Sequence, residues 1–336
     1  MNSIGILGAG TWGIALAKML FNTGRNVTVW SALKDEIEIL KNTNRHPKLK
    51  DITLPAGIGY TCDIKEACEN KDIIMFAVPS VFIRSTARQI KPYISDGQII
   101  VDVAKGIEPE TLMTLTQVIA DELDNKSVKL VALSGPTHAE EVSSDLPTTI
   151  VSACEDIRTA EYVQRFFSSP FMRVYTNTDI HGIEICGALK NIIALATGIS
   201  GGLGYGDNAR AAIITRGLAE LSRLGEKIGC SPFTFSGLTG MGDLIVTCTS
   251  MHSRNNRAGY FIGKGFSAAD AVKKVGMVVE GINALPAAVS LAKKYNVDMP
   301  IVFAVNDVVN NGVNPVDSVN SLINRELKTE VPLVFE

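Results

Sequence analysis

The sequence has few of the residues from which disulfide frameworks and metal sites are built. Its 336 residues include six cysteines and four histidines. The cysteines form no C-x-x-C pair, and the histidines form no H-x-x-x-H pair. This spacing favours reduced thiols over a disulfide framework, and it predicts that the protein binds no metal.

Long uncharged runs and a strong net charge are also absent. No uncharged stretch reaches the ~18 residues that a membrane-spanning helix needs, because Lys190 interrupts the longest candidate at residues 183–200. A net charge of −3 gives no general electrostatic reason to bind nucleic acid or an anionic membrane. The residues from Met1 to Ser3 lack the basic segment of a signal peptide. We therefore expect a cytoplasmic protein with no membrane insertion and no nucleic-acid partner.

Near its start the sequence has a strand-like run followed by three spaced glycines. Residues 4–16 turn through Gly8, Gly10 and Gly13 into a helix-like pattern, which is the G-x-G-x-x-G arrangement of a dinucleotide-binding turn. Gly8 would permit the tight turn, Gly10 would let the backbone approach a pyrophosphate, and Gly13 would let the helix pack closely on its strand. A purely structural glycine turn is the alternative, but the flanking patterns favour nucleotide binding.

The first part of the chain, to about residue 175, alternates strand-like and helical patterns. We expect strands at Ser3–Leu7, Asn26–Trp30, Asp72–Ala77, Gln98–Val103, Lys129–Leu133, Thr148–Ser152 and Met172–Tyr175. We expect helices between them at Trp12–Phe21, Lys34–Lys41, Ser80–Ile90, Pro109–Leu123 and Arg158–Phe167. Continuous apolar strands separated by helices imply parallel pairing. The pattern therefore predicts an α/β fold with a Rossmann-type, doubly wound N-terminal domain over residues 1–178.

After residue 178 the strand patterns stop and long helical patterns replace them. We expect helices at Asp179–Ser200, Asn208–Ile228, Asn255–Ile262, Ala268–Val275, Ile282–Tyr295 and Pro300–Val309. Asp179 is a suitable N-cap for the first of these, and Gly201-Gly202 a suitable end. Residues 179–336 are therefore predicted to form an all-helical substrate and catalytic domain.

Four loops each follow a predicted strand, and the doubly wound architecture should bring them together. They are the Gly8–Gly13 turn, Val78-Pro79-Ser80, Ala104-Lys105-Gly106 and Ser134-Gly135-Pro136-Thr137. Ligands of such sheets bind beyond the carboxyl ends of the strands, so all four loops should line one crevice. Lys105 is their cation, and its alternative interpretation is a solvated loop lysine.

Lys190 is the most informative single residue of the helical part. Its helical neighbours include Cys186, Ile193 and Ala194, so it lies on an apolar face. A desolvated lysine has a lowered pKa and can act as a general acid or base. The alternative is a lysine whose stem alone is buried and whose ammonium reaches solvent.

A polar block between residues 238 and 257 is poor core material. Glycines surround a lone Asp243, and Ser253 and Arg254 open a second polar run with another arginine, Arg257. The arginine fork suits a phosphate. An ordinary loop and an exposed helix start capped by Ser253 are the alternative interpretation.

Taken together, these motifs make the chain resemble the bacterial-type NAD(P)-dependent glycerol-3-phosphate dehydrogenases from end to end. The motifs that carry the resemblance are Gly8-Ala9-Gly10-Thr11-Trp12-Gly13, Ala104-Lys105-Gly106-Ile107-Glu108, Ser134-Gly135-Pro136-Thr137, Gly187-Ala188-Leu189-Lys190-Asn191, Gly240-Met241-Gly242-Asp243-Leu244, Ser253-Arg254-Asn255 and Val279-Glu280-Gly281. The resemblance implies reversible hydride transfer between NAD(P)H and C2 of dihydroxyacetone phosphate, which gives sn-glycerol 3-phosphate for phospholipid synthesis.

The resemblance also implies a role for individual residues. Lys190 would be the general acid and base. The substrate-binding residues would be Lys105, Gly135, Thr137, Asp243, Ser253, Arg254 and Asn255. The cofactor-binding residues would be Gly8, Gly10, Thr11, Trp12, Gly13, Ser31, Lys105, Ala139, Arg254, Val278 and Glu280.

The end of the second predicted strand departs from the usual NAD-binding pattern. An Asp or Glu that binds the ribose is common there, but Trp30 is followed by Ser31 and Ala32. The arginine that would meet the 2′-phosphate of NADP is absent too, although Ser31 and Lys34 could partly substitute. With no carboxylate to repel that phosphate, NADP is favoured over NAD.

Two alternative functions are open at this stage. One is a related dehydrogenase of the hydroxyacid or 6-phosphogluconate type, against which the Gly-Met-Gly-Asp and Ser-Arg-Asn blocks argue. The other is a catalytically silent dinucleotide sensor, which would keep its function without Lys190. The sequence leaves open whether the chain forms a homodimer.

Overall fold

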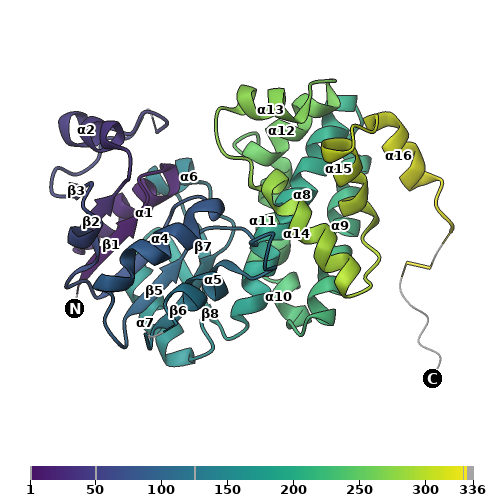
Figure 1. Cartoon of the computed structure of the whole chain (residues 1–336). Helices are drawn as coiled ribbons and strands as arrows, with labels where there is room; N and C mark the ends of the chain where they lie inside the picture. The colour runs from purple at the N-terminus through teal and green to yellow at the C-terminus, as the bar shows by residue number, and fades with distance from the viewer. Residues whose placement is uncertain (1, 50, 125, 328, 331–336) are drawn as a thin grey trace.

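A mostly parallel sheet occupies the N-terminal half of the chain, and helices make up the C-terminal half (Figure 1). The computed structural model describes residues 2–49, 51–124, 126–327 and 329–330. Within these residues the strands are β1 Ser3–Leu7, β2 Asn26–Trp30, β3 Gly59–Thr61, β4 Ile73–Phe76, β5 Ile99–Asp102, β6 Lys129–Ser134, β7 Thr148–Ala153 and β8 Met172–Asn177. All predicted strands are confirmed to within two residues at each end. The prediction missed β3, because three residues are too few to show an alternating pattern.

The strand order identifies where a ligand would bind. It is β3-β2-β1-β4-β5-β6-β7-β8, and all neighbours from β3 to β6 are parallel. The sequence order reverses between β1 and β4. In a doubly wound sheet ligands bind at this reversal, beyond the carboxyl ends of the strands. The predicted Rossmann-type fold is therefore confirmed.

The prediction of parallel pairing throughout is wrong at one place, because β6 and β7 are antiparallel. Their connection contains only the five-residue helix α6, Ala139–Ser143, which packs against α1, Thr11–Asn22. Parallel pairing needs a long crossover that returns the chain along the sheet, and α6 makes no such return. β8 then pairs parallel with β7.

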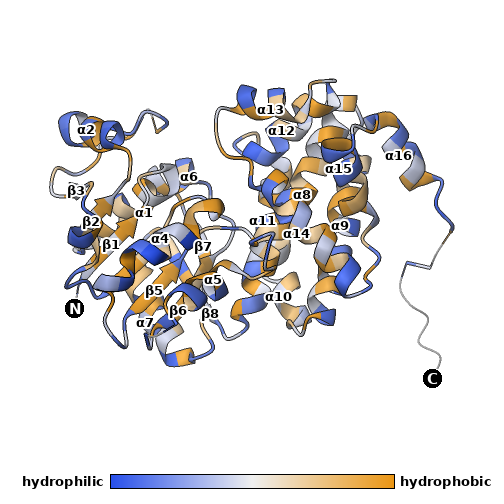
Figure 2. Cartoon of the chain, viewed as in Figure 1, coloured by the Kyte–Doolittle hydropathy of each residue, from blue (hydrophilic) through white to orange (hydrophobic). Residues whose placement is uncertain are grey.

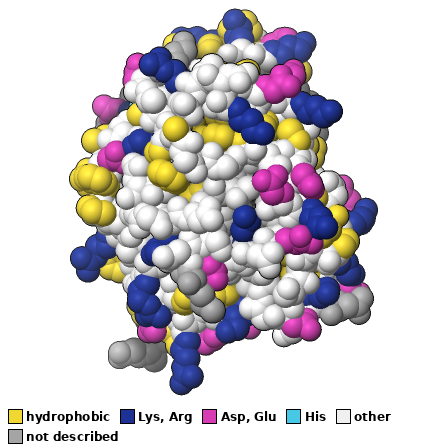
Figure 3. Space-filling model, turned by 90° about the vertical axis from the view of Figure 1, so that its left-hand side faces the viewer, with side chains coloured by type: hydrophobic (Ala, Val, Ile, Leu, Met, Phe, Trp, Pro, Cys, Tyr) yellow, Lys and Arg dark blue, Asp and Glu magenta, His cyan; other side chains and the backbone are white. Residues whose placement is uncertain are grey.

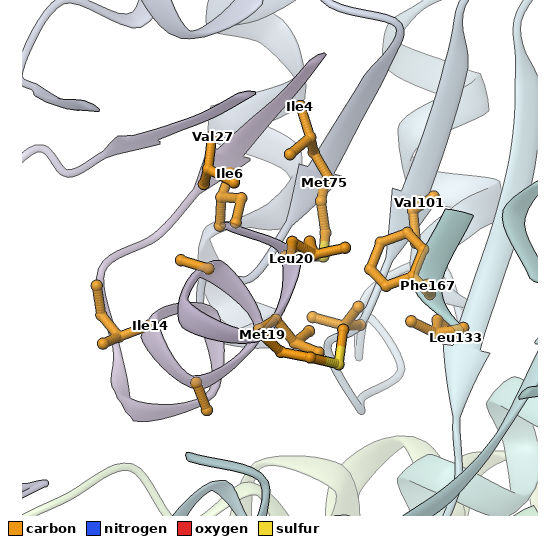
Figure 4. Packing of buried hydrophobic residues seen from close by; sticks show 14 of the residues in the cluster. Ile4, Ile6, Ile14, Met19, Leu20, Val27, Met75, Val101, Leu133 and Phe167 are labelled. Atoms are coloured by element: carbon orange, nitrogen blue, oxygen red, sulfur yellow. The ribbon is translucent and has the colours of Figure 1, made fainter. Parts of the chain in front are cut away.

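Helices cover both faces of the sheet. In addition to α1 and α6 they are α2 Lys34–Thr43, α3 Ile64–Cys68, α4 Ile83–Ile90, α5 Leu115–Glu122 and α7 Ile157–Phe167, with short 3₁₀ turns η1 Ser80–Phe82 and η2 Lys91–Tyr93. Alternate strand residues face opposite layers: Ile73 and Met75 of β4 pack with α1, α2, α6 and α7, whereas Ile74 and Phe76 pack with α3, α4 and α5. Figure 4 shows Leu20 of α1 beside Ile6 and Met75. Each such fully buried aliphatic side chain stabilises the fold by roughly 1.5–3 kcal/mol.

The helix predicted at Pro109–Leu123 begins later than expected. Leu112 has a positive φ of 62°, and an antiparallel bridge joins Ile107 to Thr114. Thr114 then caps α5, and its N–H donates to Gln117 Oε1 at 3.0 Å. A left-handed leucine is uncommon, and the hydrophobic pattern gives no sign of it.

The C-terminal half is helical among the residues described. Its elements are α8 Ile180–Leu203, α9 Asp207–Lys227, α10 Pro232–Ser236, the π-helical turn η3 Leu238–Gly242, α11 Asp243–Thr249, α12 Arg254–Gly263, α13 Ala268–Val275, α14 Glu280–Lys294, α15 Pro300–Asn310 and α16 Pro315–Ile323. All the predicted helices are confirmed, whereas α10, α11 and α16 were missed. β8 ends at Asn177 and α8 begins at Ile180. The exact division of the chain at residues 178 and 179 stays a prediction.

The long helix α8 runs through the middle of the helical half, in contact with α9, α11, α12 and α14 (Figure 1). Figure 2 shows it as a largely apolar helix among more polar ones. In the described chain it is the one helix long and apolar enough to span a membrane, but its apolar window is fully buried, as is typical of a core helix. Asp179 caps its start as predicted, since Oδ1 accepts from the Gly182 N–H at 2.9 Å.

Glycines let α12 approach α8 closely. A Cβ atom on Gly198 would lie 2.1 Å from the Asn256 carbonyl oxygen, and one on Gly259 would lie 2.2 Å from the Leu195 carbonyl oxygen. Gly202 also lies close to the backbone of α12. The predicted end of the helix at Gly201-Gly202 is wrong, because α8 continues to Leu203 and ends at Gly204, whose φ is 89°. These glycines serve packing and do not stop the helix.

A buried carboxylate joins the two halves of the chain. Glu184 of α8 accepts hydrogen bonds from Thr114 Oγ1 at 2.7 Å and from the Thr116 N–H at 2.8 Å. Burial raises the pKa of Glu184, although the threonine hydrogen bonds oppose that shift. Glu184 thus ties the start of α5 to the middle of the helical half.

Charges of both signs are interspersed over the face of the N-terminal domain that Figure 3 shows. Lysine and arginine side chains stand beside aspartate and glutamate on this face. A polyanion would therefore meet no extended positive field there.

We predict that Gly198→Ala destabilises the protein, because the added methyl group must displace the backbone of α12. The expected loss is about 1–3 kcal/mol of unfolding free energy, measured by urea denaturation. Gly201→Ala is the matched control on the same helix, since a Cβ atom there meets nothing within 4 Å. It should be neutral or stabilising by up to ~1 kcal/mol. Equal effects of the two variants would contradict the close-packing argument.

Candidate active site

The four loops predicted to lie together do so at the carboxyl ends of β1, β4, β5 and β6. A Cβ atom on Gly8 would lie 2.6 Å from the Ala77 carbonyl oxygen, and one on Gly106 would lie 2.4 Å from Ser80 Cβ. Lys105 Nζ donates to the Gly135 carbonyl oxygen at 3.2 Å. Each pair of neighbouring loops is therefore in direct contact.

The glycine turn has the shape that a dinucleotide pyrophosphate requires. Gly8 has a φ of 126°, which excludes a side chain, and a Cβ atom on Gly13 would lie 2.3 Å from the Gly8 carbonyl oxygen. A Cβ atom on Gly10 meets nothing within 4 Å, so the space in front of the turn is open. Helix α1 starts directly after Gly10, and its first N–H groups have no partners within the helix. These features fit an NAD(P) pyrophosphate.

Two lysines and one aspartate form the centre of the site. Asp243 Oδ1 lies 2.8 Å from Lys190 Nζ, and Asp243 Oδ2 lies 2.6 Å from Lys105 Nζ. Lys190 is 4% exposed and Asp243 is 2% exposed. Both alternative interpretations, the solvated loop lysine and the lysine reaching to solvent, are therefore wrong. We call these three residues the lysine–aspartate cluster.

The helices of the C-terminal half hold two members of this cluster, and Lys105 comes from the loop that follows β5. Lys190 lies on α8, and Asp243 is the first residue of α11, directly after the π-helical turn η3. A Cβ atom on Gly240 would lie 2.0 Å from the Phe235 carbonyl oxygen, so η3 packs tightly on α10. Thr247, one turn along α11, accepts a hydrogen bond from Lys190 Nζ and donates to the Asp243 carbonyl oxygen.

Burial and charge set the protonation of the cluster. Burial lowers the pKa of Lys190 to about 8, although the charge of Asp243 opposes this shift. Burial alone would raise the pKa of Asp243, but the charges of Lys105 and Lys190 outweigh it and hold that pKa below its usual value. Asp243 is therefore ionised at neutral pH, and Lys190 can exchange a proton near neutrality.

A second polar network lies between α8, α12 and α14. Asn255 Nδ2 donates to Asn191 Oδ1 at 2.9 Å, and Asn255 Oδ1 accepts from the Gly281 N–H at 2.8 Å. Ser253 caps α12, since its hydroxyl accepts from the Asn256 N–H at 3.2 Å. The alternative interpretation was therefore right about the cap, but this helix start is buried and not exposed. The network fixes the start of α12 next to Lys190, because Asn191 follows Lys190 in the chain.

Arg254 is a partly buried cation with no salt bridge inside the described chain. Burial lowers its pKa, and the charges of Glu280 and Glu140 oppose that shift. An arginine in such surroundings is suited to a bound phosphate or carboxylate.

Glu280 links the helical half to the second of the four loops. Its Oε2 accepts from Ser80 Oγ at 2.6 Å, and its Oε1 accepts from the Ser80 N–H at 3.2 Å. Val278 precedes this helix start and is half-buried. Of the predicted cofactor positions, Glu280 is thus in contact with the loop that follows β4, and Val278 lies two residues before it.

Among the described residues, no group of three His, Cys, Asp or Glu side chains is arranged to hold a metal ion. All six cysteines are free thiols, and five of them are buried.

Two family models match the chain almost completely. The model for the N-terminus of NAD-dependent glycerol-3-phosphate dehydrogenase matches residues 3–160, and the model for its C-terminus matches residues 179–320. The chain belongs to this family.

Curated members of the glycerol-3-phosphate dehydrogenase family are similar over their full length. A protein of Lactobacillus delbrueckii named glycerol-3-phosphate dehydrogenase [NAD(P)+] 2 is 63% identical, with 98% of this chain and 99% of that protein covered. A Bacillus subtilis protein named glycerol-3-phosphate dehydrogenase [NAD(P)+] is 50% identical, with 97% and 95% covered. The crystal structure of glycerol-3-phosphate dehydrogenase from Coxiella burnetii superposes with a TM-score of 0.92 at 36% identity, over 96% of this chain and 99% of that one. The resemblance read from the sequence motifs is therefore confirmed.

The structure of this family member brings most of the predicted residues to one place, while their roles stay predictions. Lys105, Gly135, Asp243 and Lys190 are linked by direct contacts, and Thr137 Oγ1 donates to the Gly135 carbonyl oxygen at 3.2 Å. Thr11 and Trp12 open α1, and Ala139 opens α6 beside it. Ser31 lies at the carboxyl end of β2, beside the glycine turn, and within the described chain no hydrogen bond joins it to the lysine–aspartate cluster.

The predicted site residues left out Thr247, Asn191, Ser80 and Glu36, although the first three lie in segments that the sequence patterns single out. Both Thr247 and Asn191 had a usable signal in the sequence. Thr247 lies one helical turn after Asp243, and Asn191 directly follows Lys190. Ser80 lies in one of the four loops predicted to line the crevice, but its contact with Glu280 comes from tertiary structure.

Glu36 lies five residues after Ser31, beyond the positions directly after β2 where a ribose-binding acid is expected. Glu36 Oε2 accepts from Ser31 Oγ at 2.7 Å. A carboxylate therefore does stand at the end of β2, and the reason for favouring NADP over NAD no longer holds.

We predict that Asp243→Asn lowers the pKa of Lys190 further below about 8, because the carboxylate charge that opposes the lowering is removed. Carbon-13 NMR titration of labelled lysine side chains would measure this pKa directly. Asp207→Asn is the control, since that side chain is 91% exposed. An unchanged or raised pKa in Asp243→Asn would contradict the charge balance described here.

Proposed function

We propose that this chain is an NAD(P)-dependent sn-glycerol-3-phosphate dehydrogenase that interconverts dihydroxyacetone phosphate and sn-glycerol 3-phosphate. The observation that carries the proposal is the buried lysine–aspartate cluster, which lies at the same carboxyl ends of the strands as the glycine turn. Family membership and the names of the 50–63% identical relatives support the same reaction. The hydroxyacid and 6-phosphogluconate alternative has no such support.

Lys190 is the general acid of the reduction in this proposal. NAD(P)H, when bound, supplies a hydride to C2 of the substrate. As the carbonyl carbon is reduced, its oxygen becomes an alkoxide, and Lys190 Nζ donates the proton that completes the hydroxyl group. In the oxidation, neutral Lys190 takes that proton back. A pKa of about 8 suits both directions near neutral pH.

The lysine–aspartate cluster also supplies charge. Two ammonium groups and one carboxylate leave a net charge of about +1 when both lysines are protonated. In a site with little water this charge stabilises the developing alkoxide. Asp243 holds both ammonium groups by hydrogen bonds, so it keeps Lys190 Nζ in place while Lys105 remains beside Gly135 and Thr137.

The phosphate and the cofactor are assigned to the neighbouring groups. Arg254 and Asn255, with Ser253 at the start of α12, would bind the substrate phosphate and glycerol. Gly8, Gly10 and Gly13, with Thr11 and Trp12, would bind the pyrophosphate, because the turn is open in front of Gly10. Ala139, Val278, Glu280, Lys105 and Arg254 complete the proposed cofactor site, with Ser31 at the adenosine ribose.

We propose a cytoplasmic location and a supply of glycerol 3-phosphate to phospholipid synthesis. The sequence expectation of a cytosolic chain with reduced thiols and the free cysteines agree with this. Analytical ultracentrifugation of the purified chain would determine whether it is a monomer or a homodimer.

We predict that the wild type oxidises NADH, NADPH or both when dihydroxyacetone phosphate is added, measured as loss of nicotinamide absorbance. Lys190→Ala should lower kcat by ~10²–10⁴-fold, the usual share of a general acid. Lys293→Ala is the control because that lysine is exposed on α14. A wild type that oxidises neither cofactor would reject the substrate, and full kcat in Lys190→Ala would favour the sensor alternative.

We predict that the pH dependence of kcat/KM follows the ionisation of Lys190. For the reduction, kcat/KM should be flat below about 8 and fall above it, because protonated Lys190 is the donor. For the oxidation, kcat/KM should rise through the same pH, because the neutral amine is the acceptor. Both limbs should move to lower pH in Asp243→Asn. A reduction limb at the ordinary lysine value would show that Lys190 is not the group that titrates.

A further inference from the structure

The end of β2 lies directly beside the glycine turn. The Gly8 N–H donates to the Trp30 carbonyl oxygen at 2.9 Å, and Ser31 is the next residue. In Rossmann-type folds the adenosine ribose binds at this point, and an acidic group there accepts hydrogen bonds from its hydroxyls. Whatever stands beside Ser31 therefore meets the 2′ position of the cofactor.

Glu36 is the group that stands there. It lies in the first turn of α2, and Ser31 Oγ donates to its Oε2 at 2.7 Å. The Leu33 N–H donates to the same serine hydroxyl at 3.1 Å, so the hydroxyl is fixed as a donor to the carboxylate. Glu36 is only half-buried, and within the described chain its Oε1 accepts no hydrogen bond. One carboxylate oxygen is thus held by the protein while the other is available to a ligand.

The charge of Glu36 has no close counter-ion. Among the described residues no lysine, arginine or histidine nitrogen forms a salt bridge with it. His46 lies close enough to interact with Glu36 and is hydrogen-bonded to the Ala9 backbone, but burial lowers the pKa of His46 and leaves its ring neutral at pH 7. The neighbouring cations Lys34 and Arg45 are exposed. A phosphate placed beside Glu36 would therefore meet a like charge.

From this geometry we infer that Glu36 makes the enzyme selective for NAD(H) over NADP(H). Its carboxylate accepts a hydrogen bond from the 2′-hydroxyl of NAD(H) and repels the 2′-phosphate of NADP(H). The inference rests on the proposed function in that it names the cofactor of that same reaction. It replaces the preference for NADP that the sequence alone suggested.

Titration calorimetry of the purified protein with NADH and with NADPH tests the inference without turnover. We expect the wild type to bind NADH at least ~10-fold more tightly than NADPH. Glu36→Gln, which keeps an acceptor for the Ser31 hydroxyl, should narrow this ratio by ~10-fold, mainly through tighter NADPH binding. Glu38→Gln is the matched control, because it removes an exposed carboxylate from the same helix. The ratio of kcat/KM values for the two cofactors should follow the binding ratio.

Ionic strength provides a readout that a merely structural role of Glu36 would not move. Raising the salt concentration should narrow the NADH-to-NADPH ratio in the wild type and leave it unchanged in Glu36→Gln. If the wild type bound NADPH as tightly as NADH or more tightly, the inference would be overturned. Loss of this NADPH binding in Lys34→Ala would then assign the 2′-phosphate to Lys34. An unchanged ratio in Glu36→Gln would also overturn it. If the nucleotide ratios hold but dihydroxyacetone phosphate is not reduced, the proposed function fails and the selectivity stands.

Discussion

The ion pairs between Asp243 and the two lysines are the interaction on which the rest of the structure depends. Removing a lysine ammonium from water costs several kcal/mol unless a partner and further hydrogen bonds replace the lost solvation. Asp243 gives one oxygen to each lysine, and Thr247 supplies an additional acceptor to Lys190. Lys105 comes from the loop after β5, and Lys190 comes from α8. The carboxylate of Asp243, at the start of α11, therefore joins the sheet half to the helical half within the site.

Helix termini are fixed elsewhere in the fold by buried carboxylates in a similar way. Glu184 accepts from the backbone at the start of α5, and Glu220 of α9 accepts from the Ile301 and Val302 N–H groups at the start of α15. Burial raises the pKa of Glu220 to about 7, while those backbone hydrogen bonds oppose the shift. Such contacts satisfy N–H groups that a helix leaves unpaired, and they hold helices in fixed positions around α8. Rigid placement of α8 and α11 is what keeps Lys190 and Asp243 in contact.

A serine–glutamate pair stands at each of the two proposed ends of the cofactor site. At one end Glu280 is held by Ser80 across the junction of the two halves. At the other end Glu36 is held by Ser31 at the carboxyl end of β2. In both places a serine hydroxyl fixes one oxygen of a carboxylate, which orients the acid without neutralising its charge. In the glycine turn between them, the space in front of Gly10 is open, since a Cβ atom there would meet nothing within 4 Å.

Local patterns in the sequence determined the Rossmann-type fold, the helical second half and every strand except β3 to within two residues. They also marked Lys190, Lys105 and Asp243 as candidates, whose roles stay predictions. Periodicity and glycine spacing act over a few residues, so they are visible in the chain itself. Tertiary structure alone decided the antiparallel β7, the left-handed Leu112, and the contacts of Glu36 and Ser80. Leu112 and the contact of Ser31 with Glu36, five positions away, are local in the chain, but hydrophobic periodicity does not report them. Ser80 and Glu280 are 200 positions apart and come from separate elements. No spacing rule along the chain reports such a contact, because it is fixed by how the finished elements pack.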